Sequence, residues 1–499
     1  MAVRHQAHCG AGNLLPIAYG PGPGRAQDHG STHTSTCRRL ATGPLPRRGA
    51  LRCGAIHAGR AMDALLLSRI QFAVTIGYHI VFPTLTMGLA LFLVVLEARE
   101  RWWGDALARQ AGEFWSRIFA LAFGMGVVSG VVLSYEIGTN FGKFSEFAGP
   151  VVGPLMSYEV MSAFFLEAGF LGIMLMGRGR VGPRLHFFAT CMVALGTLMS
   201  AFWILAANSW MHTPAGHALE DGRLRVLSWT AAIFNPSFPY RLAHMVTAAW
   251  LTTTFVVAAV GAWHVLQDAT SRFGRSMLRW GLGAALLLTP LQILIGDLHG
   301  LNTLAHQPTK VAAMEGLWDT RQQAPLLLFA WPDQVAEENR FEVAMPGLAS
   351  LILTHDWDGE VQGLKAVPPA DRPPVAIVFW SFRLMVGCGL LMLGIALWGV
   401  WRLRGGRLFG DQRYLRLLIA AGPIGFVAVI AGWVTTEVGR QPWVVHGLMR
   451  TSESGSAVSA AAVSASLTAF IVVYALIFAA FMVFFCRLAA RVPPLQETV

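Results

Sequence analysis

Charged residues are scarce in this chain. Asp, Glu, Lys and Arg together make up 13% of its 499 residues, whereas hydrophobic residues make up 54%. Soluble globular domains carry about 25% charged residues, so the composition excludes that class. The alternating pattern of an outer-membrane barrel is also lacking, and helices are then the structure that satisfies the backbone in lipid. We therefore expect an all-α integral membrane protein.

Cysteines and acidic residues are also few. The six cysteines are Cys9, Cys37, Cys53, Cys191, Cys388 and Cys486. No two of them form a CxxC pair or another ligand spacing, so we expect no disulfide framework, zinc site or iron–sulfur cluster. The net charge of +10 comes from arginines that crowd into short connecting loops. This placement favours membrane topology over nucleic-acid binding as the reason for the charge.

Residues 1–61 differ from the rest of the chain. They are rich in Gly, Pro and Arg, contain Asp28 as their only acidic residue, and have no apolar run of spanning length. A transit peptide or a basic tail is one interpretation. We prefer the other, that the native chain begins at Met62, because no apolar segment with a signal cleavage site is present. We expect residues 1–61 to be a disordered extension without function.

Apolar stretches of about 20 residues, long enough to cross a membrane, follow one another from Met62 onward. We expect spans near 69–97, 114–137, 154–177, 186–208, 240–266, 277–297, 375–401, 414–437 and 466–488. Six of these nine helices lie in residues 62–297 and three in residues 375–499. Arginines gather in the loops after the first, third, fifth and seventh spans, which predicts that these loops are cytoplasmic. The native N-terminus then lies outside, and the short C-terminal tail lies in the cytoplasm.

The one long segment between spans, residues 298–374, is predicted to lie outside. Its apolar patch at residues 325–331 is too short to span a membrane, so we expect it to pack on the helix ends. A loop of this length is usually functional or disordered. The first half has the pattern of an ordered segment, whereas the second half contains GLKAVPPADRPP and is expected to be flexible.

Three potential iron ligands lie in the predicted spans. His79 is in the first span, His244 in the fifth and Met385 in the seventh. A histidine in an apolar helix is often a hydrogen-bonded core residue, and a methionine there is usually packing. A neutral imidazole is also a common haem ligand, and a histidine and a methionine at comparable depth can close both axial positions of one haem.

Two acidic residues lie in the third span, in PLMSYEVMSAFFLEAGFLG. Glu159 and Glu167 are eight residues apart, which corresponds to about 12 Å of rise on broadly the same side of a helix. A buried carboxylate costs several kcal/mol unless it is paired or protonated. The two residues therefore indicate a proton relay, and Ser200 and Trp203 of the fourth span are candidates to line it.

The stretch at residues 432–443, GWVTTEVGRQPW, carries the strongest signal. It places Glu437, Arg440 and the tryptophans Trp433 and Trp443 at the end of an apolar run. A helix cap with interfacial tryptophans would also explain such a pattern. The string, however, closely resembles the signature of subunit I of the cytochrome bd-type quinol oxidases, and the resemblance covers essentially all of residues 62–490.

The resemblance implies three haems. His244 and Met385 match the ligands of a low-spin haem b, which receives electrons from quinol. His79 and Glu437 match the ligands of two further haems, a high-spin haem b and an oxygen-binding haem d, or haem b in its place. Which of these two residues ligates which haem stays open. Arg383 is expected to pair with a haem propionate and Trp433 to lie beside the cofactors. Arg440 is expected to be a catalytic residue, together with Glu437, Glu159 and Glu167.

The resemblance also implies a quinol site in the long loop. In QPTKVAAMEGLW, Lys310 matches a residue that donates to a quinone oxygen, and Glu315 matches one that accepts a proton from quinol. Charged residues on a solvated helix are the plainer interpretation of the loop taken alone. The short second half of the loop, with ANSWMHTPAG and QPTKVAAMEG, is similar to the branch that contains cyanide-insensitive oxidases.

The implied enzyme oxidises ubiquinol or menaquinol at the outer face of the bacterial inner membrane and reduces O2 to water. Its protons come from inside, past Glu167 and Glu159, so charge is separated without a pump. A second membrane subunit and possibly a small single-helix subunit are implied as partners. Two alternatives are a haem b electron-transfer subunit that does not reduce oxygen and a secondary transporter. The first would leave His79 and Glu437 unexplained, and we see no internal repeat of the kind that many transporters have.

Overall fold

The computed structural model describes residues 49–495, with side chains from residue 64 onward. The first helix, α1 (Gly49–Trp103), is continuous through the start of the predicted first span. Residues 1–48, which form most of the predicted N-terminal extension, lie outside the described residues, so the proposed extension of residues 1–61 stays a prediction.

Among the described residues, nine helices are long and apolar enough to cross a membrane, as predicted. They cover Ala64–Trp103, Ala106–Asn140, Gly142–Met176, Pro183–His212, Phe238–Gln267, Arg272–His306, Pro369–Arg404, Gln412–Val438 and Ala460–Ala489. Serine hydroxyls mark the start of two of them: Ser271 accepts a hydrogen bond from the backbone of Gly274, and Ser459 from that of Ala462. The helices extend beyond the predicted apolar cores because their polar ends continue the same backbone hydrogen bonding.

Seven of the spans contain one long helix, and two consist of consecutive elements. The single helices are α1, α2 (Ala106–Asn140), α5 (Pro183–His212), α7 (Phe238–Gln267), α8 (Arg272–His306), α11 (Val375–Arg404) and α14 (Ala460–Ala489). The eighth span consists of α12 (Gln412–Ala420) and α13 (Ile424–Val438), with Pro423 between them. Because a proline has no N–H to donate, it separates two helices here.

The third span is interrupted by a wider turn. Helix α3 (Gly142–Tyr158) continues into a six-residue π-helical turn, Glu159–Phe164, and then into α4 (Phe165–Met176). Turns of this kind are rare in proteins, and those that do occur are often found at functional sites. The first of the two predicted relay carboxylates, Glu159, lies at the start of this turn.

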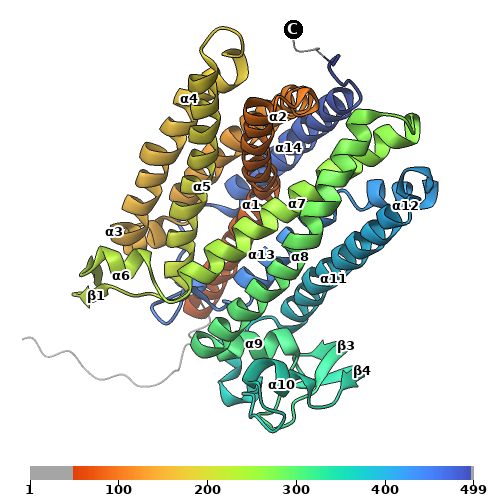
Figure 1. The fold of residues 1–499 in the computed structure, drawn as a ribbon. Coiled ribbons are helices and arrows are strands. Elements are labelled where there is room, and N and C mark those ends of the chain that lie inside the picture. Colours follow the sequence, from red (N-terminus) through yellow and green to blue (C-terminus); the bar gives the residue numbers. More distant parts are fainter. Residues whose placement is uncertain (1–48, 496–499) are drawn as a thin grey trace, which may run out of the picture. The chain divides into compact units, whose positions relative to one another are not determined.

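Short elements connect the spans. They are β1 (His217–Glu220), β2 (Arg223–Val226), α6 (Trp229–Ile233), α9 (Pro308–Glu315), β3 (Leu326–Asp333), β4 (Glu338–Met345), α10 (Leu348–Thr354), β5 (Trp443–Val445) and β6 (Met449–Arg450). The strands form three antiparallel two-stranded sheets among the described residues, which are β1–β2, β3–β4 and β5–β6. Helices α9 and α10 and the β3–β4 hairpin lie at one end of the helix bundle, here called the loop end, while α12 and the turn between α4 and α5 lie at the opposite end (Figure 1).

The loop-end elements are packed on the bundle. Leu327 and Ala330 of β3 are buried against Phe379 of α11, and the rings of Phe329 and Trp380 meet edge to face with centroids 5.0 Å apart. The predicted packing of the apolar patch at residues 325–331 on helix ends is therefore confirmed.

The proline-rich second half of the loop is tied down by charged contacts. Arg372 pairs with Glu337 at 2.6 Å and donates to the Val367 carbonyl, and Arg450 pairs with Asp371. We expected this part to be flexible from its composition, but these contacts join it both to the β3–β4 hairpin and to the segment after α13. The sequence pattern does not reveal such partners because they lie far apart along the chain.

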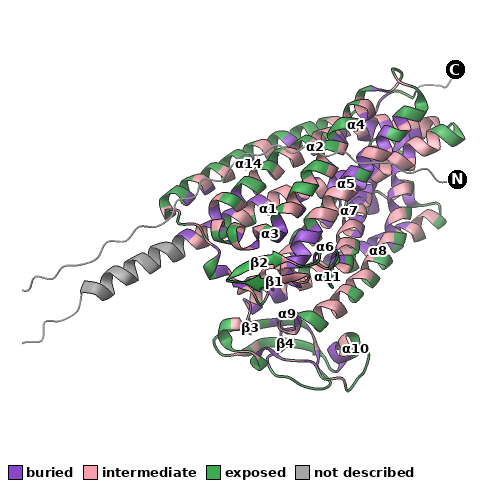
Figure 2. Cartoon of the chain, turned by 90° about the vertical axis from the view of Figure 1, so that its left-hand side faces the viewer, coloured by how far each residue is buried: buried purple, intermediate pink, exposed green. Residues whose placement is uncertain are grey.

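The outermost helices leave much apolar surface uncovered within the chain. In the most apolar 18-residue stretch of α14 only 11% of the residues are buried, and in that of the third span only 17%. Exposed residues run along α14 and α2 (Figure 2). These faces are suited to contact lipid or another membrane protein.

Candidate functional site

His244 and Met385 come from one group of packed helices. His244 lies near the loop end of α7, and Met385 lies on α11; α7 packs along α8, and α11 packs on α8 and α13. Each side chain faces a glycine of a neighbouring helix. A Cβ on Gly296 would lie 3.4 Å from His244 Cε1, and a Cβ on Gly432 would lie 3.0 Å from Met385 Sδ. The glycines therefore leave space beside both potential ligands.

Two residues of α8 adjoin the His244 ring. The side-chain nitrogen of Gln292 lies 3.1 Å from His244 Nε2 and 3.3 Å from Nδ1. The ring of His299 meets that of His244 edge to face, with centroids 5.4 Å apart. Helix α8 therefore sets the orientation of the predicted ligand, although the sequence analysis did not single out either residue.

His79 of α1 is oriented by α2. Its Nδ1 lies 2.9 Å from the Ser129 hydroxyl, which donates its own proton to the Met125 carbonyl at 2.8 Å. In the tautomer in which Nδ1 donates to this hydroxyl, Nε2 is the free acceptor. A Cβ on Gly130 would lie 3.2 Å from His79 Cε1. That tautomer presents an unprotonated nitrogen of the kind that binds iron.

Glu437, in the last turn of α13, is the centre of a polar network. Its Oε2 pairs with Arg440, and its Oε1 accepts hydrogen bonds from Asn208 at 2.9 Å and from His212 Nε2 at 3.3 Å. The other ring nitrogen of His212 lies 3.0 Å from Lys310 Nζ. The structure thus links the signature carboxylate of α13 with the predicted quinol-site lysine of α9.

The same region contains more buried positive than negative charge. Arg241, Lys310 and Arg440 are buried near Glu437. Burial and then Arg241 hold the pKa of Lys310 well below its usual value, against the opposing effect of Glu437. Nε and Nη1 of Arg440 and Nε of Arg241 have no hydrogen-bond partner among the described residues. Guanidinium nitrogen atoms without a partner suit carboxylates, including haem propionates.

Glu315 and Arg383 form a buried ion pair at 2.9 Å. Arg383 also donates to the carbonyl oxygens of Leu327 and Met314, and its guanidinium lies 4.0 Å from the centre of the Phe379 ring. The propionate pairing predicted for Arg383 thus stays a prediction, whereas its described contacts fix the predicted quinol-site glutamate. Arg383 therefore connects α11 with the loop that carries Glu315.

The two tryptophans of the signature differ in their surroundings. Trp433 is partly buried on α13, directly after the glycine that faces Met385. Trp443 lies in β5, where the Arg450 guanidinium sits 4.7 Å from the centre of its ring. Trp433 is therefore close in sequence to a potential ligand contact, and Trp443 belongs to the hairpin that follows α13.

Glu159 and Glu167 both face α5. The Ser200 hydroxyl donates to Glu159 Oε1 at 2.7 Å, and a Cβ on Gly196 would come within 2.4 Å of Glu167 Cγ. Gly196 and Ser200 are one helical turn apart and hence on one face of α5. Trp203, three residues after Ser200 on this helix, donates to Ser162 at 2.7 Å and not to either carboxylate. The two acids and Ser200 thus lie along a single helix interface.

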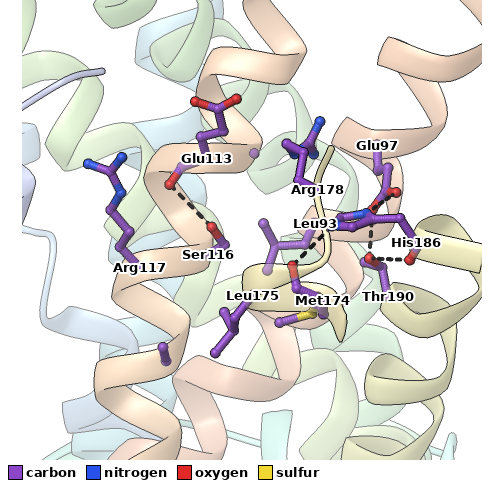
Figure 3. A pocket seen from close by; sticks show the side chains of 12 residues that line it. Leu93, Glu97, Glu113, Ser116, Arg117, Met174, Leu175, Arg178, His186 and Thr190 are labelled. Atoms are coloured by element: carbon purple, nitrogen blue, oxygen red, sulfur yellow. Dashed lines mark hydrogen bonds and ion pairs between the residues drawn. The ribbon is translucent and has the colours of Figure 1, made fainter. Parts of the chain in front are cut away.

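A polar cavity of about 300 Å³ lies at the opposite end of the bundle. Glu97 of α1 contacts His186 Nδ1 at 2.5 Å and accepts from the Thr190 hydroxyl at 2.6 Å on one side of it, while Glu113 and Arg117 of α2 lie on the other (Figure 3). Met174 of α4 also lines it, and Glu167 is seven residues before Met174, about 10 Å along the helix. Glu167 therefore lies about two helical turns along α4 from the lining of the cavity.

The residues at the loop end fit haem. They offer imidazole, thioether and carboxylate groups, all of which ligate haem iron or related iron centres in proteins. Glycines leave room at His79, His244 and Met385, and buried guanidinium atoms of Arg241 and Arg440 are available for carboxylates. Among the described residues no cluster of three or more His, Cys, Asp or Glu residues suggests another metal site.

Several residues of the site escaped the sequence analysis. His212, Asn208 and Arg241 surround Glu437 and come from α5 and α7, more than 190 residues before it in the chain. His212 stands in the quoted phrase ANSWMHTPAG, at the end of a predicted span, where a polar residue is unremarkable. The sequence feature that could have pointed to His212 was its place in ANSWMHTPAG, a phrase that also carries the family resemblance.

Comparisons with known proteins agree with the geometry. A sequence model of the family "Cytochrome bd terminal oxidase subunit I" matches residues 67–493. Cytochrome bd ubiquinol oxidase subunit 1 of Bacillus subtilis is 34% identical over 437 residues, covering 85% of this chain and 93% of that protein. Cytochrome bd-II ubiquinol oxidase subunit 1 of Escherichia coli is 30% identical over 484 residues, covering 83% and 94%.

A solved structure has the same fold. The bd oxidase from Geobacillus thermodenitrificans superposes with a TM-score of 0.81 at 30% sequence identity, over 87% of this chain and all of the matched chain. The match includes the multi-pass helical architecture described above. The chain therefore belongs to the cytochrome bd terminal oxidase subunit I family.

Proposed function

We propose that the loop end faces the outside of a bacterial inner membrane and oxidises quinol there, while protons for oxygen reduction enter from the opposite end. As a family member, the chain is subunit I of a terminal quinol oxidase, a quinol:oxygen oxidoreductase that carries haem and works with a subunit II.

Haem supplies the one-electron and oxygen chemistry when bound. His244 and Met385 are proposed to ligate a low-spin haem b, with His79 and Glu437 as ligands of a high-spin haem b and of haem d, or haem b in its place. Arg440 and Arg241 offer unpaired guanidinium atoms to propionates. The assignment of His79 and Glu437 to the individual haems is left open.

The observation that carries the proposal is the contact of Lys310 with the network around Glu437. A solvated helix would leave its lysine exposed, whereas Lys310 is buried close to a candidate haem ligand. Lys310 is proposed to donate to a quinone oxygen, and Glu315, oriented by Arg383, to accept the quinol proton. The substrate would then lie between the loop and the helix ends.

Replacing Lys310 with methionine is expected to raise the quinol KM about tenfold, equivalent to one hydrogen bond to a charged group, and to leave haem content unchanged. Oxygen uptake with decylubiquinol and pyridine haemochrome assays measure the two quantities. Lys365→Met, a change of an exposed lysine in the same loop, is the control. Loss of all haem in the Lys310 variant would instead indicate that the lysine has a structural role and contradict its proposed contact with quinol.

The same variant is expected to be at least as stable as the parent near neutral pH. Burial lowers the folded-state pKa of Lys310, so the charged lysine opposes folding at pH values below that pKa. This cost disappears as pH rises toward the ordinary value of 10.5, where the unfolded chain also loses the proton. Thermal unfolding at several pH values should therefore show an advantage of Lys310→Met that shrinks in alkali.

Proton uptake is proposed to begin in the cavity at the opposite end and to continue past Glu167 and Glu159. The N-terminus outside and the C-terminus inside follow from the arginine-rich loops at that end. Quinol protons released outside and protons taken up inside together separate charge, which is worth about 2.3 kcal/mol per charge and 100 mV. No pumping step is needed.

Glu97→Gln is expected to lower kcat about a hundredfold, at the lower limit of proton-transfer effects, without changing the quinol KM. The glutamine keeps the size of the side chain but cannot carry a proton between His186 and Thr190. Glu113→Gln, on the other side of the cavity, is the matched control. Equal loss in both variants would indicate a general effect on the cavity and not a route through Glu97.

The chain is further proposed to belong to the short-loop, cyanide-insensitive-like branch, with a small single-helix subunit as an additional partner. Ubiquinol and menaquinol are both candidate substrates. A dithionite-reduced minus air-oxidised spectrum of the purified complex, with haem extraction, tests the function directly. A low-spin b band with a chlorin band supports haem d, b-type haem alone supports its replacement, and no haem would contradict the proposal.

A further inference from the structure

His212, the last residue of α5, joins the two sides of the site through one ring. It is completely buried, with Nδ1 at 3.0 Å from Lys310 Nζ and Nε2 at 3.3 Å from Glu437 Oε1. Its backbone carbonyl accepts a hydrogen bond from Gln307 at 2.9 Å, directly before α9. The residue is therefore fixed both to α9, which carries the lysine, and to α13, which carries the carboxylate.

The partners determine which ring nitrogen holds the proton. A lysine side chain bonded to imidazole acts as donor, so His212 Nδ1 is the acceptor. An ionised carboxylate only accepts, so Nε2 carries the hydrogen and donates to Glu437. One neutral tautomer thus satisfies both contacts together, and no change of charge on the ring is required.

Lys310 depends on this ring. His212 is its hydrogen-bond partner in the described part of the chain, while the lysine stem lies against Gly439, where an added Cβ would be 2.9 Å from Lys310 Cγ. Arg241 and Arg440 are close enough to oppose its charge. A buried lysine amine with one described acceptor is directed by that acceptor, since leaving the amine without a partner would be costly.

We propose that His212 is a positioning residue that holds the quinol-site lysine against the carboxylate of Glu437 and thereby sets the direction in which Lys310 donates. This inference rests on the proposed function, in which Lys310 contacts quinol and Glu437 serves a haem. His212 itself touches neither substrate nor cofactor in this assignment. It joins the quinol site to the haem side of the protein through two hydrogen bonds.

Three variants separate the two hydrogen bonds from simple packing. His212→Asn places an amide oxygen near the position of Nδ1 and keeps the lysine contact, whereas His212→Gln places an amide nitrogen near the position of Nε2 and keeps the carboxylate contact. His212→Leu keeps volume and loses both. A residue that only fills space would be replaced equally well by leucine.

The experiment uses the purified complex with its second subunit. Oxygen uptake with decylubiquinol gives KM and kcat, and the optical and electron paramagnetic resonance spectra of the high-spin haems report on the surroundings of Glu437. His212→Leu and His212→Gln should raise KM about tenfold with kcat within twofold, and His212→Asn should leave KM near the parent value. His212→Leu and His212→Asn should shift the high-spin spectra, and His212→Gln should not.

A double variant tests whether His212 acts through Lys310. His212→Leu combined with Lys310→Met should raise KM no further than Lys310→Met alone, because both changes remove the same interaction. If Lys310→Met raises KM and His212→Leu does not, the positioning role is wrong while the proposed quinol role of Lys310 stands. If Lys310→Met leaves KM unchanged, the quinol role itself fails, and the positioning role falls with it.

Discussion

Alanine in place of His244 should abolish the low-spin haem signal of the purified complex. The imidazole is one of two proposed axial ligands, and alanine has no atom that could replace it. Quinol oxidation should fall by on the order of a hundredfold or more, since loss of ligand-supporting residues alone costs 10- to 100-fold at metal sites. Met385→Leu, which keeps the shape but removes the sulfur, should have the same spectral effect.

The structure provides a close control for this experiment. His299 lies on α8 with its ring centre 5.4 Å from that of His244, yet it is not among the proposed ligands. His299→Ala should retain the low-spin signal. If His299→Ala abolishes it and His244→Ala does not, the axial ligand has been assigned to the wrong one of two neighbouring histidines. Total haem and the amount of folded complex must be measured in each variant.

Glutamine in place of Glu167 should lower kcat by on the order of a hundredfold while the quinol KM and haem content stay close to the parent values. A carboxyl group in a proton route holds and releases a proton, and an amide of the same size cannot, for which losses of 10²–10⁴ are typical. Glu167 is buried beside Gly196, a position that accommodates the isosteric amide without a change of packing.

Glu220→Gln is the control for that variant, because Glu220 is an exposed acid of the β1–β2 hairpin paired with Arg225. Single-turnover oxidation of the fully reduced enzyme, followed with a pH-indicator dye, separates proton uptake from electron transfer. Slow proton uptake with normal electron entry supports the route. Full turnover of the Glu167 variant would exclude Glu167 from it.

The spans were the most predictable part of the protein. Each is a long and mainly apolar run, and the number of such runs sets the number of crossings in a membrane. His79, His244 and Met385 stood out as potential ligands from their place in the spans, but the ligand roles of these residues and of Glu437 came from the family resemblance. Nothing in the local pattern around Met385 distinguishes a ligand from a methionine that packs in a core.

The contacts between distant segments could not be predicted. Lys310 meets His212 across 98 residues of sequence, and Glu97 meets His186 across 89. Which polar residue faces which depends on how helices are rotated against each other, and hydrophobic periodicity does not define that rotation when a helix is apolar on most sides. The charged contacts of Arg372 and Arg450 were missed for the same reason, and the loop was therefore expected to be flexible.

The π-helical turn at Glu159–Phe164 brings the two carboxylates of the third span onto one side of it. In a regular α-helix each residue turns the chain by about 100°, so two residues eight apart would differ in direction by about 80°. A π-helical turn holds about one residue more than an α-helical turn, which makes the spacing of eight residues nearly equal to two full turns. Glu159 and Glu167 therefore both meet α5, at Ser200 and Gly196. Forcing this turn into regular α-helix without removing a residue would turn one of the two carboxylates away from α5.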